Sequence, residues 1–249
     1  MGKRERLDRL LVQRQLVLSR EEGRSRILAG EVRVNGQLVT KAGTLVNPTS
    51  ELWLKPAAAY VSRGGTKLEK ALSVFKIDVQ NKIALDVGAS TGGFTHCLLA
   101  HGARRVYAVD VGYGQLDWKL RSDPRVVVFD KTNVRYLTPS ELPSAADLAT
   151  IDVSFISLRL VLAPVQRLLC HGGEIVALIK PQFEVGKGKV GKGGVVRSSD
   201  EHMRVVEEIE AAAQRLGLIV QGVIESPLLG PAGNREFLLY VKDSRAHQG

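Results

Sequence analysis

This chain of 249 residues has few cysteines and no long apolar run. Two cysteines, Cys97 and Cys170, are too few for a disulfide framework. Both lie in apolar stretches of sequence, which predicts buried thiols in a reducing compartment. No segment approaches the roughly 18 uninterrupted apolar residues that a membrane span needs. The N-terminus, MGKRERLDRLLVQRQ, is charged throughout and has no apolar signal core. We therefore expect a cytoplasmic protein without a membrane anchor.

Acidic residues are also fewer than basic ones, and the net charge is +9. Residues 1–66 hold 12 Lys/Arg against 6 Asp/Glu, whereas the remainder of the chain holds 23 against 20. The basic excess is thus concentrated in the first quarter of the chain. This distribution predicts a polyanionic partner held by the N-terminal part. The alternative is a solvated surface that only confers solubility.

The stretch IALDVGASTGGFTHCLL, residues 83–99, is the most informative part of the chain. Strand-forming residues end at Asp86, and apolar residues at helical spacing begin about seven positions later. The turn between them holds three glycines, Gly88, Gly92 and Gly93. A second strand, residues 105–109, ends at Asp110, about the separation at which doubly wound folds read a nucleotide's ribose. The pattern predicts a nucleoside-bearing cofactor at the carboxyl ends of parallel strands.

The residues of this turn discriminate between cofactors. A dinucleotide fingerprint requires glycine where Ser90 stands. Gly88, Ser90 and Gly92 also match G-x-S-x-G, the turn that carries a hydrolase nucleophile, but several strands precede the nucleophile in that fold. Here residues 83–87 form the first expected strand of the sheet. An acidic residue before the glycines suits S-adenosylmethionine, whose ammonium can pair with a carboxylate. We favour that cofactor and keep a dinucleotide and a hydrolase as alternatives.

Residues 1–55 form a separate pattern of two basic helices and a hairpin. Ser19 is a suitable N-cap for the second helix, Gly30 ends it, and Asn35-Gly36 predicts a tight hairpin turn before a short strand at 51–54. This order resembles the small α+β RNA-binding domain named after ribosomal protein S-four. The resemblance implies that RNA phosphates are faced by Arg6, Arg9, Arg20, Arg24, Arg26 and Lys41.

A linker is expected at residues 56–61, followed by a larger α/β domain over residues 62–244. Its predicted helices are 66–75, 92–101, 114–121, 157–170 and 200–215, and its predicted strands are 82–87, 105–109, 125–129, 147–152, 173–179, 217–225 and 236–241. This alternation predicts a mostly parallel sheet of seven strands with helices on both faces. Only about ten residues join the last two strands, too few for a parallel crossover, so the last strand should run antiparallel.

Two strand ends carry candidate catalytic residues. The fourth strand runs into ATIDVSFISL, residues 149–158, where an enzyme methylating a base amine would show an Asn/Asp-Pro-Pro-aromatic motif. Neither cysteine stands at a strand's carboxyl end, as carbon-5 methylation of a pyrimidine requires. With a base amine and pyrimidine carbon-5 both disfavoured, a hydroxyl group is the remaining class of methyl acceptor. Asp152 and Lys180 end apolar strands expected to be neighbours, and Lys67 and Glu236 could complete a cluster of alternating charge. The alternative is that each is a lone surface charge.

Several motifs together carry a family resemblance. They are the N-terminal unit, YVSRGGTKLEKAL, LDVGASTGGFT, DKTNVR, DVSFISL, KPQFE and NREFLL. The chain thereby resembles the TlyA family, in which an S-four-like domain precedes an FtsJ-like, Rossmann-like S-adenosylmethionine-dependent methyltransferase domain. The resemblance implies methylation of ribosomal RNA at a ribose 2′-hydroxyl, in cytidine for characterised relatives. It implies a catalytic tetrad of Lys67, Asp152, Lys180 and Glu236. It also implies cofactor contacts at Asp86, Gly88, Ser90, Gly92, Gly93, Asp110 and Asp130, the last near the adenine amine.

Two other functions are weighed against this one. A non-enzymatic RNA-binding or ribosome-assembly factor could keep the same fold, and the family's historical label suggests a haemolysin. We further expect no metal, no membrane association, and a monomer or weak dimer.

The segment GKGKVGKG, residues 186–193, nearly matches a phosphate-binding loop but has Gly193 where Ser/Thr would hold magnesium. We expect a mobile basic loop that closes over RNA there, or else a plain linker.

Overall fold

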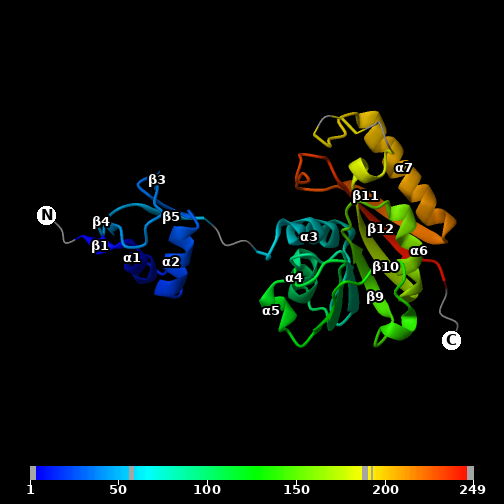
Figure 1. Cartoon of the computed structure of the whole chain (residues 1–249), viewed down its shortest axis with the longest axis horizontal. Coiled ribbons are helices and arrows are strands. Elements are labelled where there is room, and N and C mark those ends of the chain that lie inside the picture. The colour runs from blue at the N-terminus through cyan, green and yellow to red at the C-terminus, as the bar shows by residue number, and fades with distance from the viewer. Residues whose placement is uncertain (1–3, 56–58, 187–189, 192, 246–249) are drawn as a thin grey trace. The chain divides into compact units, whose positions relative to one another are not determined.

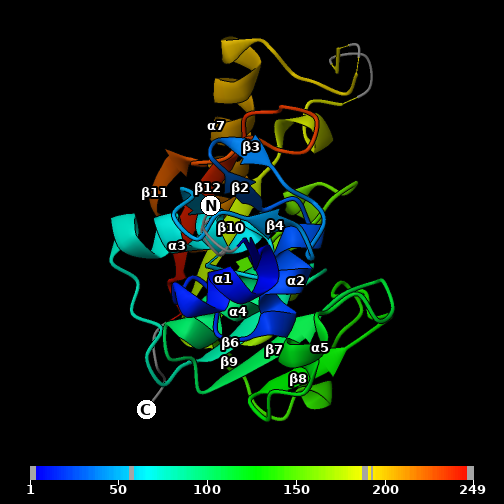
Figure 2. The same ribbon diagram turned by 90° about the vertical axis from the view of Figure 1, so that its left-hand side faces the viewer.

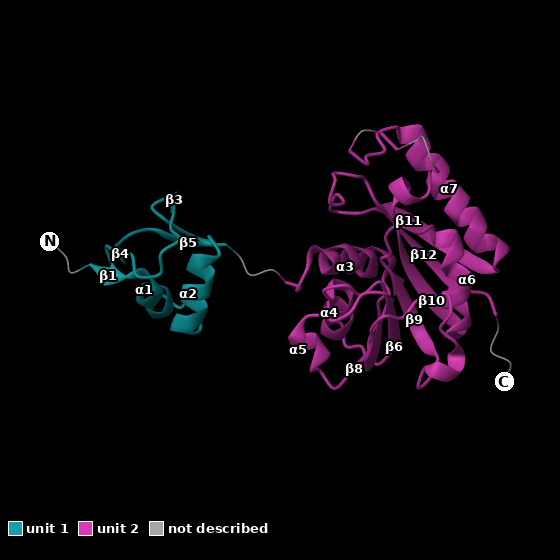
Figure 3. Ribbon diagram, in the orientation of Figure 1, with its two compact units in different colours: residues 1–58 teal, residues 59–249 magenta. Residues whose placement is uncertain are grey.

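The computed structural model describes residues 4–55, 59–186, 190–191 and 193–245, and the chain divides into two compact units (Figure 3). Unit 1 is Met1–Ala58 and unit 2 is Ala59–Gly249. Tyr60 is buried, and the Val61 amide donates to His96 Nδ1 over 3.2 Å, so the chain is already packed into unit 2 at residue 60. Of the linker expected at 56–61, residues 56–58 lie outside the described residues.

Unit 1 has two short helices and small antiparallel sheets. Its elements are β1 (Glu5–Arg6), α1 (Leu7–Gln13), α2 (Arg20–Leu28), β2 (Val32–Val34), β3 (Gln37–Leu38), β4 (Leu45–Val46) and β5 (Leu52–Leu54). The predicted cap is confirmed, because the Glu22 amide donates to Ser19 Oγ at the start of α2. The predicted hairpin is confirmed too: Asn35 and Gly36 both have positive φ, as its turn type requires. The β1–β4 pair was not predicted, because strands of two residues show no periodicity.

Unit 2 alternates strands with helices (Figure 1). Its first half contains α3 (Arg63–Phe75), β6 (Ile83–Val87), α4 (Gly93–Ala100), β7 (Arg105–Val109), α5 (Trp118–Arg121), β8 (Val126–Phe129) and η1 (Pro139–Glu141). Its second half contains β9 (Ala146–Ile151), η2 (Leu158–Leu160), α6 (Leu162–Arg167), β10 (Leu169–Ile179), η3 (Pro181–Phe183), α7 (Ser199–Arg215), β11 (Leu218–Glu225) and β12 (Phe237–Asp243).

The seven strands of unit 2 form one sheet in the order β11-β12-β10-β9-β6-β7-β8. β12 pairs antiparallel with both β10 and β11, and the other pairs are parallel. This confirms the predicted fold class, including the antiparallel last strand. The order also makes β6, β9 and β10 parallel neighbours, so their carboxyl ends lie side by side at the same edge of the sheet.

Side chains alternate between the two faces of this sheet and build two apolar cores. Leu85 of β6 packs with α6 and α7, whereas its neighbour Ala84 packs with α3 and α4. Figure 1 shows the sheet between these two helical layers, and Figure 2 looks toward the α3 and α4 side. The sheet is therefore covered on both faces, as the alternation of strands and helices predicted.

Two predicted helices are wrong in extent. The helix expected at 157–170 is a 3₁₀ turn, a short α6 and the first residues of β10. Pro164 lies in the first turn of α6 and has no amide to donate to the Leu160 carbonyl, which fits a helix that begins at Leu162 and does not continue from the 3₁₀ turn. The helix expected at 114–121 is only α5, because Gly114 has φ +65° and Asp117 caps the helix by accepting from the Lys119 amide.

Asp86 is a buried carboxylate that joins three elements beneath the glycine turn. Thr95 of α4 donates its hydroxyl to Asp86 Oδ2 over 2.6 Å, and Thr150 of β9 donates to Oδ1 over 3.0 Å. The residue is completely buried. Burial raises the pKa of this carboxyl to about 7, although both hydroxyl contacts lower it.

This burial predicts a specific pH dependence of stability. The carboxyl pKa is about 7 in the folded chain and 3.8 in the ordinary reference state, so between these values the folded protein binds more protons than the unfolded one. The free energy of unfolding should therefore fall as pH rises across that window, by on the order of 1 kcal/mol per pH unit. Asp86→Asn cannot titrate and should show a flatter profile of melting temperature between pH 5 and pH 7.

Asp123→Asn is the matched control, because Arg125 lowers the pKa of Asp123 and its titration lies below this window. The control should keep the slope of the unmodified protein. Parallel profiles for the unmodified protein and Asp86→Asn would show that Asp86 does not titrate with a raised pKa.

Candidate active site

Two adjoining cavities lie at the carboxyl ends of β6, β9 and β10. The first has a volume of about 590 Å³ and the second about 800 Å³. Six residues line both: Gly88, Ser90, Asp152, Ser154, Phe155 and Phe183. Molecules bound in the two cavities would therefore meet beside Asp152.

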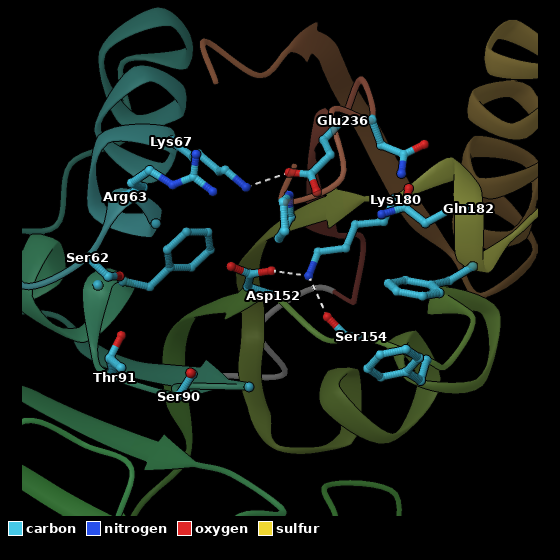
Figure 4. A pocket seen from close by; sticks show the side chains of 18 of the residues that line it. Ser62, Arg63, Lys67, Ser90, Thr91, Asp152, Ser154, Lys180, Gln182 and Glu236 are labelled. Atoms are coloured by element: carbon cyan, nitrogen blue, oxygen red, sulfur yellow. Dashed lines mark hydrogen bonds and ion pairs between the residues drawn. The ribbon is translucent and has the colours of Figure 1, made fainter. Parts of the chain in front are cut away.

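The first cavity holds two lysine–carboxylate pairs (Figure 4). Lys180 Nζ lies 2.6 Å from Asp152 Oδ1 and donates to Ser154 Oγ over 2.9 Å. Lys67 Nζ lies 2.5 Å from Glu236 Oε2. The structure thus brings all four predicted tetrad residues together in one cavity, whereas lone surface charges would have faced solvent separately.

The sheet explains why these residues meet. Asp152 directly follows β9 and Lys180 directly follows β10, and these strands are parallel neighbours with Ile151 opposite Ala177. Lys67 comes from the second turn of α3, and Glu236 precedes β12, the other neighbour of β10. The side chains are largely shielded: 11% of Lys180 and 23% of Asp152 is exposed. Removing one member would leave its partner charged and poorly solvated.

The second cavity is bordered by the glycine turn and Asp110. Gly88 has φ +81°, and a Cβ there would lie 2.5 Å from the Asp152 carbonyl oxygen, so only glycine fits. Asp110 Oδ2 accepts from the Ser90 amide over 2.8 Å, and Oδ1 accepts from the Gly112 amide over 2.7 Å. Asp110 therefore shapes the turn and also faces the cavity at the end of β7.

The other predicted cofactor residues occupy different places. Gly92 is the N-cap of α4, and Gly93 lines the first cavity. Asp86 and Asp130 do not line either cavity. Asp86 lies beneath the turn with both oxygens bonded to threonines, and Asp130 Oδ2 accepts from Arg121 Nη1 over 2.9 Å. Both carboxylates are thus engaged with the protein itself, and the cofactor contacts expected of them stay predictions.

Several lining or supporting residues lie within the motifs DVSFISL and KPQFE but were not predicted as site residues. Ser154 accepts from Lys180, and Phe155 and Phe183 place their ring centroids 5.0 Å apart on the cavity wall. Glu184 is buried and accepts from the Ser157 hydroxyl over 2.6 Å and the Leu158 amide over 2.7 Å. Burial raises the pKa of the Glu184 carboxyl. The signal that could have identified them was their place in these two motifs, beside Asp152 and Lys180 in the chain.

In unit 1, two of the residues predicted to face RNA phosphates, Arg6 and Arg20, share the carboxylate of Asp8. Asp8 is buried, and it accepts from Arg6 Nη2 over 2.9 Å and from Arg20 Nε over 2.9 Å. The hydrogen bond from Arg6, together with Arg20, lowers the Asp8 pKa to about 2. Arg9, Arg20, Arg24 and Lys41 are exposed, and Arg6 is partly exposed.

Arg26 departs from that prediction. Only 16% of its side chain is exposed, and it pairs with Glu31 and donates to the Lys55 carbonyl. Since its charge is drawn into the fold at the end of α2, it does not offer a free guanidinium to a phosphate. The prediction of Arg26 as an RNA contact is therefore not supported by this geometry.

The described residues offer neither a metal centre nor a membrane span. Among them, no group of three or more His, Cys, Asp or Glu side chains could hold a metal ion. No helix in the described part of the chain is long and apolar enough to cross a membrane. In the basic loop predicted at 186–193, residues 187–189 and 192 lie outside the described residues, so its expected closure stays a prediction.

Comparison with known proteins agrees with this geometry. Residues 60–243 match the model of the FtsJ-like methyltransferases, and residues 5–52 match that of the S4 domain. The chain is 48% identical to the 16S/23S rRNA (cytidine-2′-O)-methyltransferase TlyA of Mycobacterium tuberculosis, over 97% of this chain and 91% of that protein. It is 40% identical to Hemolysin A of Brachyspira hyodysenteriae, over 94% of this chain and 98% of that protein.

A solved structure from Streptococcus thermophilus, described as a candidate hemolysin, covers 98% of this chain and 90% of its own. It superimposes with a TM-score of 0.75 at 44% sequence identity. Both relatives and this structure are matched over nearly their whole length. The chain therefore belongs to the TlyA family, whose members join an S4 domain to an FtsJ-like methyltransferase domain.

Proposed function

We propose that this protein transfers a methyl group from S-adenosylmethionine to a ribose 2′-hydroxyl of ribosomal RNA, with cytidine as the acceptor nucleoside. One observation carries the proposal: the Lys180–Asp152 pair stands where the two cavities adjoin, beside the Lys67–Glu236 pair. The printed name of the mycobacterial relative supplies the RNA class and the cytidine. Because its proposed substrate is ribosomal RNA, we place the protein in the cytoplasm.

The second cavity fits the nucleoside part of S-adenosylmethionine. Its border combines a carboxylate at the end of β7 with a glycine turn that brings the backbone close, which is how doubly wound folds hold a ribose. Asp110 would accept from the ribose hydroxyls, and Gly88 and Ser90 would face the cofactor. Gly92 and Gly93 open α4 beside it, while Asp86 and Asp130 support the ends of β6 and β8. When bound, S-adenosylmethionine supplies an electrophilic methyl group and retains on sulfur the electron pair of the sulfur–carbon bond that breaks.

The first cavity then holds the acceptor ribose. The Lys180 ammonium can donate to the oxygen of the 2′-hydroxyl and fix its direction, and Asp152 keeps that ammonium in place. The carboxylate of Asp152 offers an acceptor for the hydroxyl proton, which leaves oxygen as the new oxygen–carbon bond forms. Lys67 and Glu236 form a second ion pair, and Arg63 adds one positive charge to the lining of the cavity, which suits a substrate that carries phosphates.

A first experiment tests the cofactor site. Asp110→Ala removes the carboxylate at the second cavity and should weaken S-adenosylmethionine binding by roughly 10- to 100-fold, as expected when hydrogen bonds to a charged group are removed. Isothermal calorimetry without RNA measures this. Asp200→Ala, an exposed carboxylate at the start of α7, should leave the affinity unchanged. Unchanged affinity in Asp110→Ala, or tight binding of a nicotinamide dinucleotide, would contradict the assignment.

A second experiment tests the chemistry. Lys180→Ala should lower the rate of methyl transfer to ribosomal RNA by about 10²–10⁴, the usual contribution of a positioned proton-handling group. Binding of S-adenosylmethionine should remain, because Lys180 belongs to the other cavity. Lys70→Ala, an exposed lysine one turn after Lys67 on α3, is the matched control. Full turnover in Lys180→Ala would rule out a mechanism in which this ammonium orients the hydroxyl.

A third experiment tests where RNA is held. Replacing Arg9, Arg20 and Arg24 by glutamine should weaken binding to ribosomal RNA and flatten its dependence on salt, by roughly one unit of logarithmic slope for each phosphate that the protein no longer neutralises. Filter binding across a salt series measures both quantities. Arg215→Gln, at the end of α7, serves as the control. Equal slopes for the triple variant and the unmodified protein would show that unit 1 is not the RNA anchor.

A further inference from the structure

Gln182 occupies a place in the first cavity that the proposed mechanism does not use. It lies in η3, two residues after Lys180, and Figure 4 shows its side chain beside that of Lys180. The residue lines the same cavity as Lys180, Asp152 and Glu236. A molecule that brings a hydroxyl to Lys180 therefore enters a cavity that Gln182 also lines.

The carboxamide of Gln182 makes no hydrogen bond to the described residues. Its Oε1 is buried and has no hydrogen-bond partner, and its side chain makes no hydrogen bond within the part of the chain that the structure describes. A buried amide oxygen without a partner destabilises the folded chain, so such a group calls for an explanation. The other carboxamide that lines this cavity, Asn234, accepts from the Val196 amide and donates to the Gly194 carbonyl. Asn234 thus holds the fold, whereas Gln182 has a donor and an acceptor to offer.

This pair of groups matches the edge of a nucleobase. Cytosine carries its amino donor next to the N3 acceptor, and a carboxamide can meet such adjacent groups with two parallel hydrogen bonds. Enzymes that act on an unstacked nucleotide read its base by hydrogen bonds to this edge. The last torsion of a glutamine side chain is broad and roughly two-fold, so either end of the amide can turn toward the cavity.

We propose that Gln182 is a specificity-determining residue that hydrogen-bonds the Watson–Crick edge of the acceptor cytosine, with its oxygen on the amino group and its nitrogen on N3. This inference rests on the proposed function. Lys180 then fixes the ribose and Gln182 fixes the base of the same nucleotide. The enzyme would distinguish cytidine from pyrimidin-2-one ribonucleoside, which has no group in place of that amine.

The test combines a protein change with a substrate change. Gln182→Met keeps the length of the side chain and removes both hydrogen-bonding groups. With ribosomal RNA containing the natural cytidine, its kcat/KM should fall by roughly 10- to 100-fold, the worth of a bidentate base contact. With RNA in which pyrimidin-2-one ribonucleoside, lacking the amine, replaces that cytidine, the unmodified protein should lose a similar factor. Gln182→Met should then show little preference between the two RNAs.

Three controls separate the outcomes. S-adenosylmethionine affinity should be unchanged in Gln182→Met, and Gln214→Leu, an exposed glutamine on α7, should behave like the unmodified protein. If Gln182→Met folds poorly, Gln182→Glu keeps the acceptor and loses the donor, and should retain part of the preference for the amine. Equal use of both RNAs by the unmodified protein, or the same preference in Gln182→Met, overturns the inference. Failure of the unmodified protein to methylate any cytidine would instead contradict the proposed function.

Discussion

The ion pair between Lys180 and Asp152 is the interaction on which the site depends. It exists because β9 and β10 are parallel neighbours, so that the residues leaving their carboxyl ends face each other. Each charge is poorly solvated and needs the other, and Lys67 and Glu236 repeat this arrangement across the cavity. Within each pair the charges cancel, and Arg63 leaves the lining of the cavity with one net positive charge.

The glycine turn places the second cavity next to the Lys180–Asp152 pair. Gly88 lets the turn pass close to the Asp152 backbone, Asp110 accepts from the Ser90 amide of the turn, and Asp86 joins the strand before the turn to α4. The two cavities consequently share a wall at Asp152. In the proposed reaction the methyl donor and the acceptor hydroxyl approach this wall from different cavities, which explains why an RNA-sized substrate need not displace the cofactor.

Much of this arrangement could be predicted from the sequence, since strand ends and glycine turns follow short-range rules. Lys180 and Asp152 each end an apolar run, so their meeting followed from the expected parallel sheet. Other features depended on tertiary partners that no local pattern reveals: Arg26 is drawn toward Glu31, and Gln182 lines the cavity with no partner for its amide oxygen. Pro164 did carry a local signal, but the apolar residues around it favoured one long helix.

The most direct test of the account is the identity of the methylated product. Ribosomal subunits should be incubated with the protein and isotope-labelled S-adenosylmethionine, and their RNA digested to nucleosides for mass spectrometry. The account predicts label in 2′-O-methylcytidine, with the methyl group lost together with the ribose fragment rather than retained on the base. Label on a base, or no labelled nucleoside from either subunit, would contradict it.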